Sequence, residues 1–69
     1  MGWVLASEDF DGTGTHAVPS GTCHAVDLED GLTACGRPVR SLRLWAEVPW
    51  RRAGMLGLTR CRICDNNAT

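Results

Sequence analysis

The residues most able to do chemistry in this chain are four cysteines and the histidine that follows the first of them: Cys23, His24, Cys35, Cys61 and Cys64. Cys61 and Cys64 form a Cys-x-x-Cys pair, whose two intervening residues let a tight turn direct both thiolates at one metal ion. Cys35 is followed by Gly36, and glycine tolerates the positive φ of the tight turn that often follows a metal-binding cysteine. Two segments distant in the sequence would then close one tetrahedral site of the sulfur and nitrogen type that Zn²⁺ prefers.

Two other uses of these cysteines stay open, namely a redox dithiol at Cys61 and Cys64, or disulfides. A redox Cys-x-x-Cys normally lies at a helix start inside a βαβ scaffold, and 69 residues leave no room for one. No export signal is visible, because the short apolar stretch Trp3–Ala6 has no Lys or Arg before it. We therefore expect a cytoplasmic protein, in which clustered cysteines more often bind metal than pair. The expected cofactor is one structural Zn²⁺.

The fourth ligand is either Cys23 or His24. Adjacent residues of an extended segment point to opposite faces, so only one of these two can face the metal. Counting cysteines favours Cys23 and a four-cysteine site, whereas His24 would give a site of three cysteines and one histidine. His16 is a weaker candidate, and we expect it to be a solvated strand or loop residue.

The length of the chain explains why a metal would be needed. The apolar core in a chain of 69 residues rarely supplies more than roughly 3–5 kcal/mol of folding free energy. A domain of this size therefore needs an additional cross-link, such as a bound metal ion. Length also excludes a multidomain enzyme, a doubly wound nucleotide-binding fold and a solenoid, and no apolar run is long enough for a membrane span. We expect one zinc-binding domain over 1–69, with an N-terminal strand and acidic loop in 1–21 and a metal-bound core in 22–65.

The elements that would position these ligands are short strands separated by glycine, proline and polar residues. We expect a strand over 3–6, an acidic loop over 8–15, a turn over 19–21, a hairpin of 23–26 and 32–35 around an Asp-Gly turn, a strand over 39–48, a loop over 50–57 and a returning strand over 58–61. The tail after Cys64 is too short for the helix that follows the last ligands of a treble clef. The predicted fold class is a small, metal-stapled, β-rich, zinc-ribbon-like domain with short antiparallel hairpins and little or no helix.

The 39–48 segment carries the clearest strand pattern, although a helix is the alternative. Its alternation predicts that Arg43 and Glu47 face water. The residues predicted to face the core are Leu42, Leu44, Ala46 and Val48.

The net charge of −1 conceals a polarised chain, because residues 1–34 carry −6 and residues 35–69 carry +5. The candidate partner-binding residues are Arg37, Arg40, Arg43, Trp50, Arg51, Arg52, Arg60 and Arg62. One basic face with Trp45 and Trp50 interleaved could hold phosphates and stack bases, with Trp50 as an exposed anchor. Alternatively, the arginines pair with the acidic half, or the chain docks on a protein by charge complementarity.

Three short motifs resemble a group of small uncharacterised zinc-finger-type proteins from actinobacteria. The motifs are His24-Ala25-Val26, the stretch from Thr33 to Val39, and Arg60-Cys61-Arg62-Ile63-Cys64, and together they span about residues 22–65. In that group a His precedes a Cys-Gly step and a Cys-x-x-Cys closes the chain. The resemblance implies His24 as the fourth ligand beside Cys35, Cys61 and Cys64.

The expected function is that of a non-catalytic zinc-binding module that docks on a macromolecule. The partner would be an unidentified protein or nucleic acid, with a role in transcription or translation by analogy with other small zinc ribbons. We expect no membrane and no small-molecule substrate, because no catalytic motif occurs and the chain barely encloses a pocket. A thiol-based, redox-responsive zinc protein is the alternative.

Overall fold

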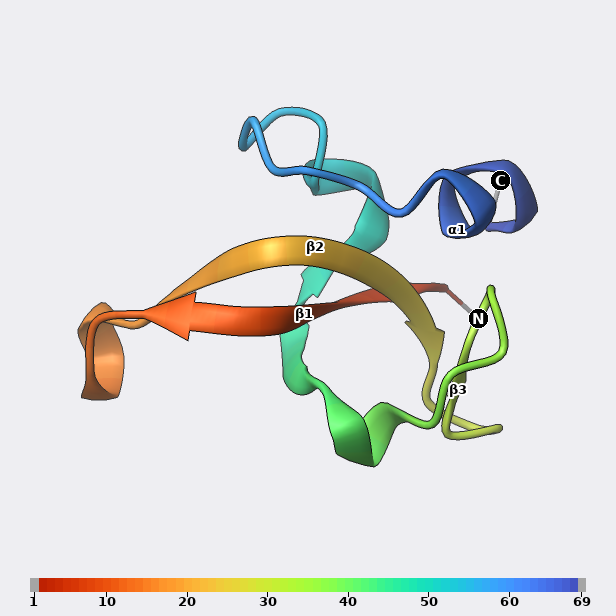
Figure 1. Cartoon of the computed structure of the whole chain (residues 1–69), viewed down its shortest axis with the longest axis horizontal. Helices are drawn as coiled ribbons and strands as arrows, with labels where there is room; N and C mark the ends of the chain where they lie inside the picture. Colours follow the sequence, from red (N-terminus) through yellow and green to blue (C-terminus); the bar gives the residue numbers. More distant parts are fainter. Residues whose placement is uncertain (1, 69) are drawn as a thin grey trace.

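A computed structural model describes residues 2–68 of the chain as one four-stranded antiparallel sheet in the order β3-β2-β1-β4 (Figure 1). The strands are β1 Val4–Asp11, β2 Val18–Asp27, β3 Leu32–Thr33 and β4 Arg43–Pro49. The helical elements are α1 Arg62–Asn67 and three 3₁₀ turns, η1 Gly14–His16, η2 Val39–Ser41 and η3 Trp50–Arg52. The expected β-rich fold with antiparallel hairpins and little helix is confirmed.

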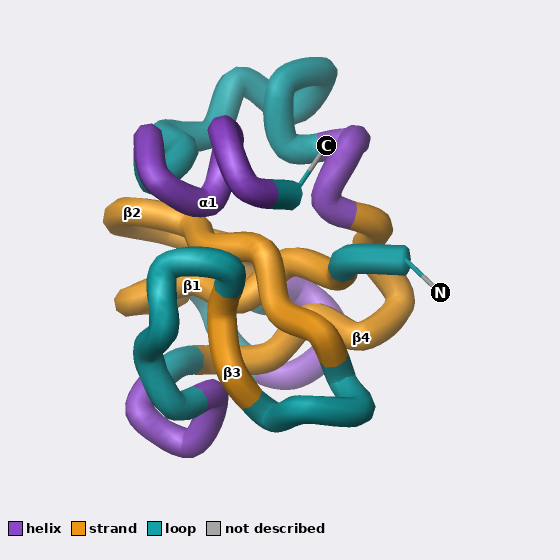
Figure 2. The backbone as a smooth tube through the Cα atoms, turned by 90° about the vertical axis from the view of Figure 1, so that its right-hand side faces the viewer, coloured by secondary structure: helices purple, strands orange, loops and turns teal. Residues whose placement is uncertain are grey.

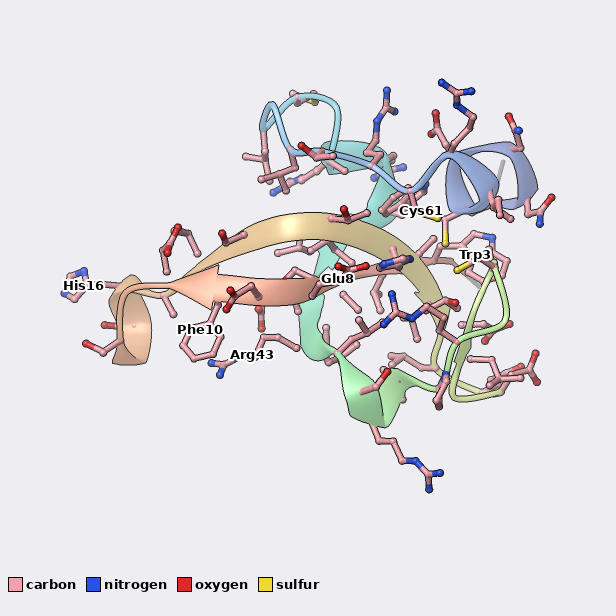
Figure 3. All side chains as sticks on the ribbon, viewed as in Figure 1. Trp3, Glu8, Phe10, His16, Arg43 and Cys61 are labelled. Atoms are coloured by element: carbon pink, nitrogen blue, oxygen red, sulfur yellow. The ribbon has the colours of Figure 1, made fainter. Side chains whose placement is uncertain are left out.

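A long hairpin of β1 and β2 forms the body of the sheet, with η1 and the exposed His16 at its tip (Figure 3). The strands pair from Val4 opposite Val26 to Asp11 opposite Val18. The predicted acidic loop over 8–15 is therefore wrong in its first half, and the predicted turn over 19–21 is wrong. The register shifts between Ser7 and Asp9, and Gly21 adopts a φ of 71° opposite this irregularity, so its turn-like conformation is part of a bulge.

The hairpin predicted around the Asp-Gly turn is confirmed, because Val26 pairs with Thr33 and Asp27 pairs with Leu32. β3 is shorter than predicted, since the chain turns immediately after Thr33. This early turn places Ala34, and with it the adjacent Cys35, beside β2.

Strand β4 has the predicted type, but its inward face is only partly as predicted. Residues 39–41 form η2, and Trp45 faces the core with 9% of its surface exposed. The predicted inward face is wrong at Leu44 and Ala46, which are exposed, whereas Val48 packs against the core and Arg43 and Glu47 are exposed as predicted. The indole fills far more volume than a leucine, and its Nε1–H donates to the buried Ser7 Oγ at 2.8 Å.

The C-terminal segment lies along β2 as a single parallel bridge, not as the predicted strand. The N–H of Cys23 donates to the Thr59 carbonyl at 2.8 Å, and the N–H of Cys61 donates to the Cys23 carbonyl at 2.8 Å. Helix α1 then begins inside the Cys-x-x-Cys pair and runs to Asn67, so the expectation that the tail is too short for a helix at the last ligands is wrong. Figures 1 and 2 show α1 and the 50–58 segment above the β1–β2 pair and η2 below it.

The core contains few large side chains. Its buried members are Leu5, Cys23, Ala25, Trp45, Trp50, Ala53, Cys64 and Ala68. Trp50 is only 6% exposed, so the predicted exposed anchor is wrong. Trp3 packs against the same cluster, as expected for tryptophans that fill the core of a small domain. Within residues 2–68, no helix has the length and apolar character needed to cross a bilayer.

The Trp45–Ser7 hydrogen bond generates a stability prediction. Ser7→Ala leaves a buried indole N–H without its acceptor, so we expect the free energy of unfolding to fall by about 1–3 kcal/mol in urea denaturation. Ser41→Ala is the matched control, because the exposed Ser41 Oγ donates to the Pro38 carbonyl at 2.8 Å and should lose less than about 0.5 kcal/mol. Equal losses in the two variants would contradict this role for Ser7.

Candidate metal centre

The outer edge of β2 brings the two cysteine segments to His24. Carbonyl groups two residues apart on a strand point to the same edge. On this edge the Cys23 carbonyl accepts from the Cys61 N–H and the Ala25 carbonyl accepts from the Ala34 N–H, both at 2.8 Å. The backbone thus fixes one ligand segment on each side of His24, although 37 residues of sequence separate His24 from Cys61.

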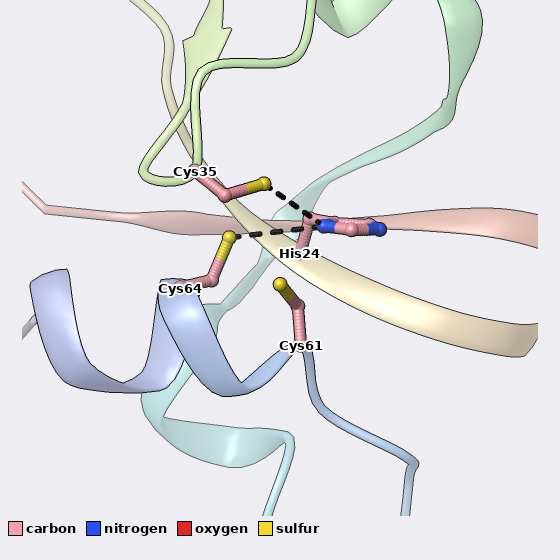
Figure 4. Close-up of side chains that lie close together, drawn as sticks. All are labelled: His24, Cys35, Cys61 and Cys64. Atoms are coloured by element: carbon pink, nitrogen blue, oxygen red, sulfur yellow. Dashed lines mark hydrogen bonds between the residues drawn. The ribbon is translucent and has the colours of Figure 1, made fainter.

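Four potential ligand atoms meet at this place: one ring nitrogen of His24 and the sulfurs of Cys35, Cys61 and Cys64, all within 4.8 Å of one another (Figure 4). Nδ1 of His24 lies 3.5 Å from Cys35 Sγ and 3.7 Å from Cys64 Sγ. In a tetrahedral zinc site, bonds of about 2.0 Å to nitrogen and 2.3 Å to sulfur put those atoms about 3.5 Å apart. The two nitrogen–sulfur distances at His24 are therefore close to those around a tetrahedral metal ion.

Cys23 lies outside this cluster. Its side chain points to the opposite face of β2 from His24, is fully buried in the apolar core, and has the Gly21 carbonyl 3.9 Å from its sulfur. Burial raises the pKa of the Cys23 thiol, and the charge of Glu8 adds to this effect. Of the two alternatives that the sequence leaves open, the geometry favours His24.

Glu8 contacts Nε2 of His24, the ring nitrogen that points away from the cysteine sulfurs. Its Oε2 lies 2.9 Å from His24 Nε2 and accepts a hydrogen bond from Arg37 Nη1 at 2.7 Å. An ionised carboxylate only accepts, so the proton of a neutral imidazole lies on Nε2 and the lone pair of Nδ1 faces the sulfurs. The hydrogen bonds from His24 and Arg37 lower the pKa of Glu8, which keeps it ionised. A carboxylate behind a ligating histidine is the usual second layer of a protein metal site.

Thr33 and Gly36 shape the turn around Cys35. The Arg37 N–H donates to Thr33 Oγ1 at 2.8 Å, which leaves the hydroxyl proton free for Cys35 Sγ at 3.1 Å. The Gly36 N–H donates to the Thr33 carbonyl at 2.9 Å, and Gly36 has a φ of 94°. The predicted positive φ after Cys35 is confirmed, since only glycine adopts it without strain.

The thiols of the cluster differ in acidity. Burial opposes ionisation of Cys35, but the hydrogen bond with Thr33 and the polar contacts with the other members of the cluster outweigh it and lower the pKa of Cys35 to about 6. Burial raises the pKa of Cys64 to about 11, and the neighbouring Cys35 raises it further. A divalent cation at the centre of the cluster would favour the ionised form of Cys64.

The structure does not gather the candidate arginines on one face. Arg37 pairs with Glu8, Arg60 Nη1 pairs with Asp65 Oδ1 at 3.1 Å, and Arg43 stacks over Phe10 with its guanidinium carbon 4.6 Å from the ring centroid. Besides Arg43, the arginines that make no ion pair within residues 2–68 are Arg40, Arg51, Arg52 and Arg62. Arg40 belongs to η2, on the opposite side of the β1–β2 pair from η3 and α1 (Figure 1).

The fold and the cluster together define a small β-rich protein with a His/Cys site that could hold a metal ion. Comparison with family models, with curated proteins and with solved structures finds no match to this chain. The resemblance to actinobacterial zinc-finger-type proteins therefore stays a prediction that rests on the motifs alone.

The geometry predicts which cysteine is dispensable for metal. Cys23→Ser should keep one zinc per chain, because Cys23 is not among the clustered ligand atoms, whereas Cys61→Ser should lose the metal. Zinc content of the purified variants, measured by mass spectrometry of the metal, checks both. A zinc-free Cys23→Ser protein that retains its fold would contradict this assignment.

The carboxylate behind His24 leads to a second prediction. Glu8→Gln removes the charge that orients the imidazole, so zinc affinity should fall about tenfold in competition with a chromogenic chelator. Glu29→Gln is the matched control, because Glu29 is exposed and makes no ion pair within the described part of the chain. Equal affinity of the two variants would show that Glu8 does not support the site.

Proposed function

We propose that this protein is a small non-catalytic zinc module in which one structural Zn²⁺ is held by His24 Nδ1 and by the sulfurs of Cys35, Cys61 and Cys64. The observation that carries the proposal is the approach of these four ligand atoms to within 4.8 Å, with the second ring nitrogen of His24 fixed by Glu8. Three sulfurs and one imidazole nitrogen form a donor set that suits zinc.

The energetics support a structural role. Within residues 2–68, the main apolar cluster contains one leucine and three alanines beside its tryptophans and cysteines, with Ala6 and Val26 also buried, and a core in a chain of this size supplies roughly 3–5 kcal/mol. Structural zinc sites bind with an apparent free energy of about 10–16 kcal/mol, which becomes folding free energy when the unfolded chain has no preformed site. The metal would therefore contribute more to folding than the core does.

The ligand count supports a non-catalytic role. A catalytic zinc needs three protein ligands and one open position, whereas four protein ligands close the coordination sphere. Within residues 2–68, the His24 cluster is the single group of His, Cys, Asp and Glu residues with metal-binding spacing. A closed site on a domain of this size suits a module whose activity is binding to a macromolecular partner.

The test is to measure metal content and then remove the metal. The purified protein should contain one zinc per chain, and a strong chelator should abolish its far-ultraviolet circular dichroism, with recovery when Zn²⁺ is added back. The Cys23→Ser variant is the control for nonspecific effects on thiols. A fold that survives chelation but changes with oxidant would overturn the proposal in favour of a thiol-based sensor.

A further inference from the structure

A group of exposed apolar and basic side chains lies on the side of the molecule that α1 and the 50–58 segment cover. Met55 is 86% exposed, Leu56 is 55% exposed and Ile63 is 56% exposed. Arg51, Arg52 and Arg62 are exposed on η3 and at the start of α1. We call these six residues the basic apolar surface: Arg51, Arg52, Met55, Leu56, Arg62 and Ile63.

Side-chain contacts of Arg60 join the two segments that carry this surface. The Arg60 guanidinium lies beside Gly54, 3.5 Å from the point that a β-carbon would occupy if Gly54 had one. The same guanidinium pairs with Asp65 of α1 at 3.1 Å. Arg60 thus bridges the loop after η3 to the helix. Figures 1 and 2 show both segments on the same side of β2. The two segments that carry these side chains are therefore linked through Arg60 on one side of β2, and Cys61 and Cys64 anchor the helical segment to the proposed metal centre.

The charges of the surface are unbalanced. The three arginines named above make no ion pair within residues 2–68, and Asp65, the nearby acid, is already paired with Arg60. The acidic residues of the chain lie mainly on β1, on β2 and in the turn that follows β2. An occupant of this surface must therefore bring negative charge and apolar side chains together.

Single-stranded nucleic acid has no aliphatic side chains to fill an apolar surface, and proteins bind it largely through aromatic side chains on which its bases stack. Trp45 and Trp50 are buried, and Trp3 packs against the core. Phe10 is 43% exposed, but it lies beside Arg43 far from α1 (Figure 3). Exposed methionine, leucine and isoleucine side chains instead suit the apolar side chains of a peptide.

We propose that the basic apolar surface docks an acidic peptide segment of a partner protein that carries leucine-like side chains between its carboxylates. This inference rests on the proposed function as a docking module and specifies its partner class. The arginines would meet the carboxylates, and Met55, Leu56 and Ile63 would receive the apolar side chains.

The probe is a displayed library of random peptides, selected on the purified protein and counter-selected on Arg52→Glu. Enriched peptides should combine Asp or Glu with Leu, Ile, Met or Phe, and a synthetic copy should bind more weakly as NaCl is raised. Arg52→Glu should weaken its binding about tenfold. Arg40→Glu, an exposed arginine on η2 with no ion pair within residues 2–68, should change it less than about twofold.

A second pair of variants, at Leu56 and Leu28, tests the contribution of the apolar side chains to binding. Leu56→Ser should weaken binding of the synthetic peptide about tenfold, whereas Leu28→Ser, at 53% exposure in the turn after β2, should leave it within about twofold. Equal effects in either matched pair, or enriched peptides without acidic residues, would overturn the inference. Tighter binding of a short single-stranded DNA that is lost in Arg52→Glu would overturn it in favour of nucleic acid. Zinc content is measured on the same samples, so that failure of the proposed metal site can be distinguished from failure of the proposed peptide docking.

Discussion

The hydrogen bonds along the outer edge of β2 determine how the rest of this molecule is arranged. Cys23 and Ala25 present their carbonyls to this edge, and the N–H groups of Cys61 and Ala34 donate to them. Because the side chain between those carbonyls points to one face of the strand, His24 lies where the two cysteine segments meet. The same strand directs Cys23 into the apolar core, so two adjacent residues serve two different parts of the structure.

Electrostatics around the cluster follow from this arrangement. Glu8 orients the imidazole so that Nδ1 faces the sulfurs, and Thr33 donates to Cys35, whose pKa is lowered. Burial raises the pKa of the Cys64 thiol, so a nearby cation would favour its ionisation. A divalent metal would thus complete a site whose supporting hydrogen bonds already exist. Its binding would connect β2, the turn that follows β3 and helix α1 in a domain with a small core.

The sequence allowed the β-rich fold class and the cysteine positions of the cluster to be predicted, because Cys-x-x-Cys spacing and a glycine after Cys35 are local signals. It left Cys23 and His24 undecided, because strand alternation says only that the two point in opposite directions. Glu8 was missed as a partner of His24, since the register shift between Ser7 and Asp9 decides which acid faces the imidazole. The prediction for β4 was wrong at Leu44 and Ala46 for a related reason: the buried indole of Trp45, which bonds to Ser7, takes the inward position between them.

The ligand set of the bound metal is the most direct test of the proposed centre. X-ray absorption at the zinc edge of the purified protein should show three sulfur atoms at about 2.3 Å and one nitrogen at about 2.0 Å. That result would match His24, Cys35, Cys61 and Cys64 as the ligands. A shell of four sulfurs would instead require Cys23 in place of His24, and a shell with a water oxygen would mean an open site, so either result would contradict the proposed centre.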